Sequence, residues 1–303
     1  MNTSRYRDLN TALRERFGCR VQKISLDAGL TCPNRDGNVG LGGCIYCSSR
    51  GSGTGLYNRF PIAQQLERGK ERLGRRYRAK KFIAYFQSFS NTYGELQELE
   101  ELYREAISVD DVVGLAVGTR PDCVQEGVLD LLAALNRRTY VWLEYGLQSV
   151  HEHTLELINR GHGLAAFLDA VELTRQRHLD ICVHIILGLP GEDKGDMMTT
   201  ARTLAKLDIQ GIKIHSLYVI RSTPLADMYQ RGEYRCLSRE EYVDIVCEFL
   251  ALLPPKLVIH RLTGDPHPQE LLAPQWALEK QTNLEAIRQA LERRNLWQGK
   301  YFG

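Results

Sequence analysis

The chain has 303 residues, with 39 lysines and arginines against 37 aspartates and glutamates, and 43% of its residues are hydrophobic. This ordinary composition excludes an intrinsically disordered or collagen-like protein. No run of about 18 apolar residues occurs, and the first residues lack the apolar segment of a secretion signal. We therefore expect a cytoplasmic protein that has no membrane partner.

The first element expected is a basic amphipathic helix within residues 1–20, on which Leu9, Leu13 and Phe17 share one face. Strands and helices then alternate along the chain. The expected strands cover residues 21–26, 81–87, 112–118, 140–146, 181–188 and 212–218, and the clearest helices cover 96–106, 127–135, 153–158, 164–177 and 197–207. This alternation predicts an α/β fold of parallel βαβ units, and six such units indicate a barrel or part of one.

The domain organisation expected from these patterns has three parts. Residues 1–20 form the N-terminal helix, residues 21–218 form the core, and residues 219–303 form a C-terminal α/β extension. The extension contains helical patterns, a Pro254-Pro255 break and a short strand at 257–262. We expect it to pack on the core.

Polar residues appear where the apolar strands end. The expected strands are nearly continuous apolar runs, as is typical of strands that are buried on both faces. The polar residues at their carboxyl ends are Gln87, Thr119, Arg120, Gln148, Ser149, Glu192 and His215. In barrels of alternating strands and helices the chemistry sits at this face.

Three of the eight cysteines lie close together, at Cys32, Cys44 and Cys47, in a glycine-rich stretch after the first strand. Clustered cysteines in a reducing compartment are more often metal ligands than disulfides. A structural zinc ion usually takes four ligands, whereas three thiolates suit a 4Fe-4S cluster with one open iron. The other five cysteines, Cys19, Cys123, Cys182, Cys236 and Cys247, are expected to be packing or surface thiols.

The three-cysteine loop, with Tyr46 directly before Cys47, resembles the radical S-adenosylmethionine superfamily. Its gap of eleven residues after Cys32 is similar to that of the elongator catalytic subunit branch. Further motifs of that branch follow in order at residues 118–122, 144–149, 159–162, 188–192 and 211–215. The Cys-Pro-Asn-Arg-Asp-Gly start at residue 32 and the Arg-Leu-Thr-Gly-Asp stretch at 261–265 resemble a small bacterial family that includes the YhcC and YtqA groups.

The resemblance implies a partial (β/α)6 TIM-type barrel, with a 4Fe-4S cluster held by Cys32, Cys44 and Cys47. It implies that the open iron binds S-adenosylmethionine, whose one-electron cleavage gives a 5′-deoxyadenosyl radical that abstracts hydrogen. The residues implied to contact this cofactor are Tyr46, Gln87, Ser88, Glu144, Gln148, Arg160, Gly188 and Leu189.

Individual cofactor assignments have structural alternatives. Gln148 matches a ribose contact, or is a strand-end residue bonded to a loop. Arg160 matches the partner of the cofactor carboxylate, or is a helix-end arginine. Gln87-Ser88 replaces the usual Gly-Gly-Glu-like turn, and Gly118 stands where elongator relatives carry glutamate.

The catalytic candidates are His184, Lys213, His215 and Arg261, which project from strands five, six and the late strand and face either a substrate in the barrel mouth or the core. The resemblance implies remodelling of a C5 substituent of a tRNA wobble uridine, with a flavodoxin or ferredoxin as electron donor. A small molecule or peptide substrate is the alternative, and a zinc-containing RNA-binding module without catalysis is another.

A basic segment at residues 68–81 holds eight cations and one acid, against +2 for the whole chain. This segment suits contact with a phosphate backbone, although a solvated basic helix face has the same pattern. The sequence makes no prediction of an oligomeric state.

Overall fold

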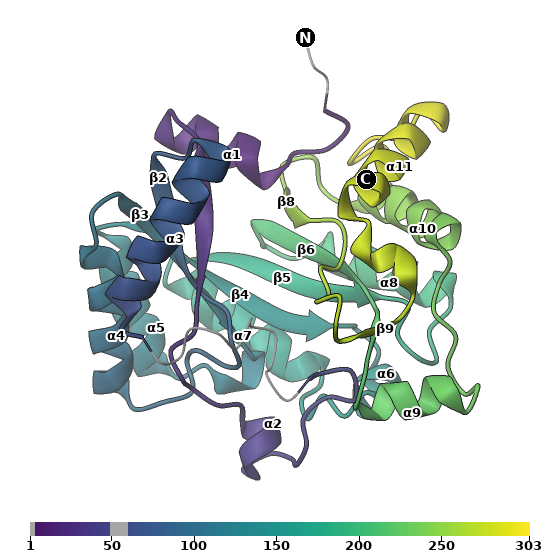
Figure 1. Cartoon of the computed structure of the whole chain (residues 1–303), viewed down its shortest axis with the longest axis horizontal. Coiled ribbons are helices and arrows are strands. Elements are labelled where there is room, and N and C mark those ends of the chain that lie inside the picture. The colour runs from purple at the N-terminus through teal and green to yellow at the C-terminus, as the bar shows by residue number, and fades with distance from the viewer. Residues whose placement is uncertain (1–3, 49–59) are drawn as a thin grey trace.

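The computed structural model describes residues 4–48 and 60–303. Within these residues, seven parallel strands form one curled sheet in the order β1-β2-β3-β4-β5-β6-β8 (Figure 1). The strands are β1 (Val21–Leu26), β2 (Lys81–Phe86), β3 (Val112–Thr119), β4 (Tyr140–Gln148), β5 (Asp180–Leu187), β6 (Gly211–Ser216) and β8 (Val258–Arg261). The prediction of a parallel α/β partial barrel is confirmed.

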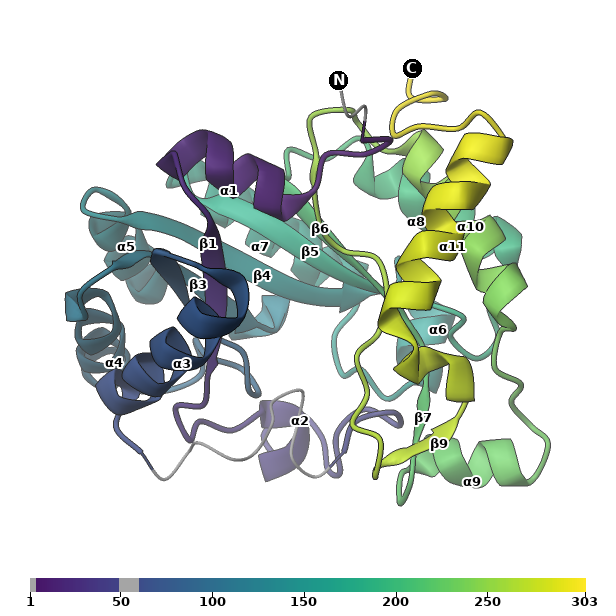
Figure 2. The ribbon, with the colours of Figure 1, turned by 45° about the horizontal axis from the view of Figure 1, so that its top comes forward.

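The helices cover the outer face of the sheet and its two ends (Figures 1 and 2). They are α1 (Leu9–Phe17), α2 (Pro33–Asp36), α3 (Ile62–Tyr77), α4 (Leu96–Ser108), α5 (Glu126–Asn136), α6 (Glu152–Leu157), α7 (Leu164–Gln176), α8 (Lys194–Leu204), α9 (Pro224–Gln230), α10 (Arg239–Leu252) and α11 (Lys280–Arg293). Alternate strand residues such as Phe82, Ala84 and Phe86 point outward into the main hydrophobic core beneath these helices. Among the described residues, no helix is long and apolar enough to cross a lipid bilayer.

Local signals start two of the outer helices. Asp193 and Asp196 form a capping box at the start of α8, and Ser238 and Glu241 form one at the start of α10. Each box satisfies backbone N–H groups that the first helical turn leaves without partners. The capping box of α8 therefore fixes the residue at which the loop after β5 ends and the helix begins.

The inner face of the sheet is apolar near the amino ends of the strands. Trp142, Ile83, Ala116 and Cys182 pack there with Leu13 of α1 in a separate small core. The predicted apolar face of the N-terminal helix is confirmed, because Leu9 and Phe17 pack against the same core. Helix α1 thereby closes the amino end of the half-barrel (Figure 2).

The C-terminal extension contributes a strand to the barrel sheet. β8, expected as a short strand of the extension, pairs in parallel with β6 and becomes the seventh strand. The remaining strands, β7 (Val219–Ile220) and β9 (Leu271–Ala273), form an antiparallel pair, and α10 packs on both α8 and α11. The domain boundary placed at residue 218 stays a prediction.

Candidate active site

A cavity of about 310 Å³ lies between the inner face of the sheet and the cysteine loop, and most of the predicted site residues line it. Those that do are Cys32, Cys44, Tyr46, Cys47, Gln87, Glu144, Gln148, Arg160, His184, Lys213, His215 and Arg261. They come from four strands and three loops, so the fold brings together residues that are far apart in the sequence.

The cysteine loop takes its shape from one short helix and several glycines. Helix α2 starts directly after Cys32, whose carbonyl oxygen accepts from the backbone N–H of Arg35 at 2.8 Å. Gly43 has φ +81°, and an added Cβ there would lie 2.9 Å from Arg35 Nε. A backbone turn then joins Cys47 N–H to Cys44 O at 2.9 Å. Glycine is required at residue 43 because only glycine adopts this φ easily and leaves room for the arginine.

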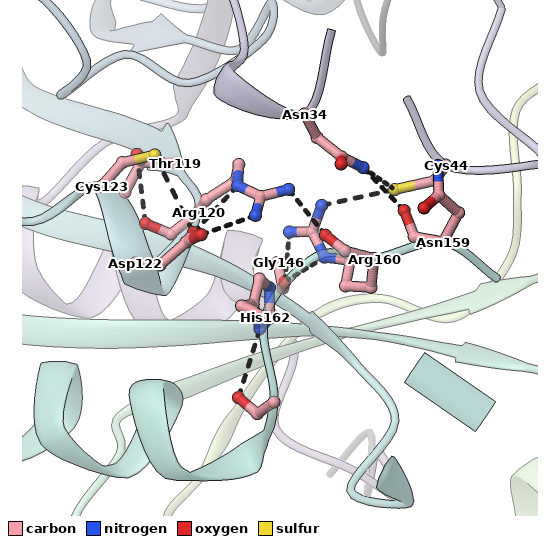
Figure 3. Close-up of polar contacts among 11 residues, drawn as sticks. Asn34, Cys44, Thr119, Arg120, Asp122, Cys123, Gly146, Asn159, Arg160 and His162 are labelled. Atoms are coloured by element: carbon pink, nitrogen blue, oxygen red, sulfur yellow. Dashed lines mark hydrogen bonds and ion pairs between the residues drawn. The ribbon is translucent and has the colours of Figure 1, made fainter. Parts of the chain in front are cut away.

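Two asparagines fasten this loop to the barrel, as Figure 3 shows. Asn34 Nδ2 donates to Asn159 O at 2.6 Å, and Asn159 Nδ2 donates to Gly43 O at 2.8 Å. Asn34 Nδ2 also lies 3.8 Å from Cys44 Sγ. N–H donors beside ligand sulfurs orient them and tune the metal centre that they hold.

Arg160 lies between the cysteine loop and the end of β4 (Figure 3). Its Nε donates to Gly146 O at 3.2 Å, and its Nη1 lies 3.6 Å from Cys44 Sγ. Burial disfavours the charge of this guanidinium, but the neighbouring Cys44 and Tyr46 raise its pKa overall. Arg120 donates to Arg160 O at 2.7 Å and holds the turn in place. A buried cation is thus positioned next to a predicted cluster ligand.

The three thiols of the loop do not converge on one point. Among the described residues, only Glu144, Cys182 and His184 bring three possible ligand atoms within 4.8 Å of one another. A single zinc ion bound by three thiolates would hold their sulfurs about 3.8 Å apart. In a 4Fe-4S cluster each thiolate binds a different iron, so wider spacing is expected. The thiols are therefore not arranged as a preformed three-thiolate zinc site.

The end of β4 is irregular where Gln148 enters the cavity. The pairing of β4 with β5 shifts between Gly146 and Gln148, and Gln148 has φ +79°. An added Cβ at Gly146 would lie 2.7 Å from Gln148 Nε2 and 2.9 Å from Arg160 Nη2. Such bulges re-aim side chains next to active sites. Gly146 leaves the space in which both side chains gather.

Three predicted cofactor residues do not line the cavity. Ser88 is buried, and Leu189 packs in an apolar cluster with Leu217. Gly188 O accepts from the hydroxyl of Tyr234 at 2.9 Å, and an added Cβ at Gly188 would lie 2.9 Å from Leu237 Cδ1. The glycine permits close approach of these side chains, and its contact with a cofactor stays a prediction.

Glu144 is fully buried at the closed end of the cavity. Its Oε1 accepts from Trp142 Nε1 at 2.8 Å and from Lys23 Nζ at 2.9 Å. Its Oε2 binds His184 Nε2 at 2.8 Å and also binds Lys213. Burial opposes the charge of the carboxylate, but Lys213 and Lys23 hold its pKa well below the usual range. Both carboxylate oxygens are therefore occupied by protein donors.

The pKa values of two basic partners of Glu144 are also lowered, which for these groups disfavours the charged form. Burial lowers the pKa of Lys213 to about 7, helped by the charge of Lys23 and opposed by Glu144. Burial and the charge of Lys213 lower the pKa of His184 to about 4. Lys213 Nζ also donates to the hydroxyl of Tyr85 at 2.9 Å. At neutral pH His184 is uncharged and donates from Nε2 to the carboxylate.

Sequence reasoning missed Lys23, Tyr85 and His260, which also line the cavity. A signal was present for two of them. Lys23 interrupts an apolar strand, and Tyr85 shares the inward-facing period of Ile83 and Gln87. His260 lies in the strand that the sequence assigns to the C-terminal extension. The sequence therefore does not indicate that its side chain lines the barrel cavity.

The cavity also contains polar groups suited to a bound molecule. Ser90 Oγ on the cavity wall and Asn34 Oδ1 beside the cysteine loop are buried and have no hydrogen-bond partner among the described residues. Buried polar atoms normally have partners. The residues present therefore fit an iron–sulfur cluster with a polar ligand beside it.

Known protein families and relatives match most of this chain. Residues 32–204 match the Radical SAM superfamily, and residues 209–293 match the Radical_SAM C-terminal domain. The chain is 45% identical to YtqA of Bacillus subtilis over 98% of this chain and 93% of that protein. It is 38% identical to YhcC of Escherichia coli K12 over 90% of this chain and 87% of that protein.

Among solved structures, the archaeal Methanocaldococcus infernus Elp3 with an N-terminal deletion has a similar fold, with a TM-score of 0.71. The match covers 92% of this chain and 64% of the archaeal chain, at 18% identity. At this identity the likeness concerns the fold alone. It extends beyond the six core strands into the C-terminal part that supplies β8.

Proposed function

This chain belongs to the radical SAM superfamily, and on that premise we propose that it is an enzyme that holds a 4Fe-4S cluster on Cys32, Cys44 and Cys47 and binds S-adenosylmethionine beside it. The observation that carries the proposal is the single cavity into which these thiols, Arg160 and Gln148 all project. When bound, the cluster and S-adenosylmethionine would supply one-electron chemistry that abstracts hydrogen from carbon.

The protein residues have binding and positioning roles in this proposal. Arg160 pairs with the carboxylate of S-adenosylmethionine, because a guanidinium presents parallel N–H donors to a carboxylate. Gln148, aimed by the irregular end of β4, contacts the ribose. Gln87 at the end of β2 replaces the usual acidic turn as the partner of the amino group. The closed end behind Glu144 excludes water from the reacting atoms.

The proposed substrate is a tRNA, of which a C5 substituent on the wobble uridine is remodelled. Support comes from the resemblance to the elongator branch and from the basic segment of α3. Of the eight cations in this segment, most are exposed: Arg68, Arg72, Arg75, Arg76, Arg78 and Lys80. Four of these cations lie on α3 and two directly follow it, and such clustered exposed cations suit contact with phosphates. The proposal includes a cytoplasmic location and reduction by a flavodoxin or ferredoxin.

Anaerobic purification and reconstitution test the cofactor proposal. We expect a brown protein with about four irons per chain, as one 4Fe-4S cluster requires. Incubation with a reductant and S-adenosylmethionine should release 5′-deoxyadenosine. A colourless protein that binds zinc, or a loaded protein that releases no 5′-deoxyadenosine, would contradict the proposal.

Mass spectrometry of tRNA nucleosides from a deletion strain tests the substrate. We expect one wobble-uridine nucleoside to accumulate and its C5-remodelled product to disappear, with restoration by the intact gene. A gene encoding Cys44→Ala should fail to restore the product. An unchanged nucleoside profile would reject tRNA and favour a small molecule or peptide.

A further inference from the structure

The described residues that line the cavity carry far more positive than negative charge. Their cationic side chains are Lys23, Arg35, Arg120, Arg160, Lys213 and Arg261, and their one carboxylate is Glu144. Three of these cations, Arg35, Arg120 and Arg160, lie near the cysteine loop. Of the other three, Lys23 and Lys213 bind Glu144, and Arg261 lies on β8 in register with Lys213.

The charge of Arg261 is the least compensated of the three. Lys23 and Lys213 both bind Glu144 directly. The ion pair recorded for Arg261 among the described residues joins its Nη2 to Asp265 Oδ2 at 3.8 Å, and that carboxylate also binds Lys280 at 2.8 Å. A half-buried cation with so weak a partner loses hydration without an equivalent return.

Two histidines beside Arg261 have buried ring nitrogens that make no hydrogen bond, although His260 Nδ1 lies 3.9 Å from Glu144 Oε1. His215 Nε2 and His260 Nδ1 are buried and make no hydrogen bond to the described residues, although both side chains line the cavity. The rings of His184 and His215 are 5.6 Å apart, and the ring of His260 packs edge-on against Trp142. This part of the cavity lining presents ring nitrogens and a guanidinium to a bound molecule.

An irregularity in β8 creates this wall. Ile212 of β6 pairs with Ile259, but the next residue, Lys213, pairs with Arg261. The extra residue in β8 lets consecutive side chains, His260 and Arg261, both line the cavity. Gly211 makes the room, because an added Cβ there would lie 2.6 Å from His260 Nε2.

We propose that the cavity wall formed by β6 and β8 binds a carboxylate or phosphate group of the substrate between Arg261 and His215. Arginine offers only donors and prefers acceptors that take two parallel N–H groups, which carboxylate and phosphate do. An anion here supplies the missing negative charge and gives His215 Nε2 a partner. The inference rests on the proposed function and specifies its substrate as one that carries an anionic group into the barrel.

This anion is distinct from the carboxylate of S-adenosylmethionine. Arg160, proposed to bind that carboxylate, contacts Cys44 and the end of β4. Arg261 instead lies on β8, where it is in register with Lys213. The two cations thus belong to different walls of the cavity, and one small carboxylate cannot serve both.

Thermal unfolding of the reconstituted holoenzyme, titrated separately with acetate and inorganic phosphate at constant ionic strength, tests the inference. The unfolding temperature should rise with at least one probe, and the probe that acts identifies a carboxylate or a phosphate site. Arg261→Gln and His215→Gln should each weaken the apparent Kd about tenfold, the loss of one charge-assisted hydrogen bond. Arg288→Gln, an exposed arginine on α11 paired with Glu285, should leave it unchanged.

Several results would overturn the inference. One is no response of the holoenzyme to either probe, and another is an equal response in Arg261→Gln and His215→Gln. If Arg261→Gln fails to fold, Arg261→Lys and His215→Gln decide the matter. Competition between the probe and S-adenosylmethionine would also overturn it, because the anion would then occupy the cofactor subsite. Iron content and 5′-deoxyadenosine release, measured on the same samples, report separately on the proposed function.

Discussion

The cavity has two ends, and they are stabilised differently. At the mouth, Cys32, Cys44 and Cys47 sit on a loop that backbone atoms and two asparagines hold in place. At the closed end, side chains from β1, β4 and β5 bind one another directly around Glu144. The mouth thus presents ligands for a group that has to be acquired, whereas the closed end is already bonded before any ligand arrives.

The two ends therefore affect different properties of the protein. The closed end affects the stability of the fold, and the mouth affects binding of the cluster. Loss of a thiol at the mouth removes a ligand, and Arg160, the buried cation beside Cys44, keeps its hydrogen bonds to Gly146 O. Loss of Glu144 leaves the side-chain amines of Lys23 and Lys213 and the imidazole of His184 without their acceptor. We therefore expect substitutions at the mouth to abolish chemistry with little cost in stability, and substitutions at the closed end to lower stability directly.

The largest effect is expected from Cys44→Ala at the mouth. Bound iron and release of 5′-deoxyadenosine should fall to background, because the cluster loses one of three protein ligands. The urea midpoint of the iron-free protein should stay close to that of the unsubstituted chain. Cys236→Ala, which alters a cysteine outside the cavity lining, is the matched control and should retain iron. Iron retention in Cys44→Ala would remove this cysteine from the ligand set.

The next effect is expected from Glu144→Gln at the closed end. We expect a loss of about 3–5 kcal/mol in the free energy of unfolding, measured by urea denaturation of the iron-free protein, because a buried ion pair loses one partner. Glu67→Gln breaks an exposed pair with Lys70 and should cost less than about 1 kcal/mol. Similar losses of unfolding free energy in the two variants would show that the contacts of Glu144 do not stabilise the folded protein.

Lowering the pH should reduce the stability contributed by the closed end before it affects the cysteine loop at the mouth. His184 has a folded-state pKa of about 4 against an ordinary 6.5, so the unfolded chain takes up the proton first as the pH falls. The contribution of His184 to the free energy of unfolding is fully present above pH 6.5 and is lost as the pH falls toward 4. Between pH 7 and pH 5 it amounts to about 2 kcal/mol.

His184→Gln should lack this part of the acid sensitivity in urea unfolding at pH 7 and pH 5. His153→Gln, a change at an exposed histidine on α6, should retain it. His215 and His260 have pKa values lowered in the same direction by burial, so a smaller slope should remain in His184→Gln. Identical slopes in both variants would contradict the assignment.

The smallest effect is expected from Gly146→Ala, which alters the mouth without touching a thiol. The added Cβ would displace Gln148 and Arg160, which lie 2.7 Å and 2.9 Å from it. We expect S-adenosylmethionine to bind about tenfold more weakly, as expected when one charge-assisted contact is displaced. Iron content should be unchanged. Equal binding, measured by equilibrium dialysis of the loaded protein, would show that neither side chain contacts the cofactor.

The mouth was more predictable than the closed end for a physical reason. The cysteines and their glycines lie within sixteen consecutive residues, Cys32 to Cys47, so their spacing is visible in the chain. Glu144 was predicted as a site residue, but Lys23 and Lys213 come from strands more than sixty residues away on either side. No local pattern records that these side chains meet.

The sequence by itself determined the parallel strands, the family resemblance and the thiols, because periodicity and short motifs act over a few residues. Only the tertiary structure decided that β8 joins the barrel, that Glu144 is enclosed by donors, and that His260 and Arg261 face the cavity. Those outcomes depend on strand pairing and on a register shift, which place residues distant in the chain a few ångströms apart.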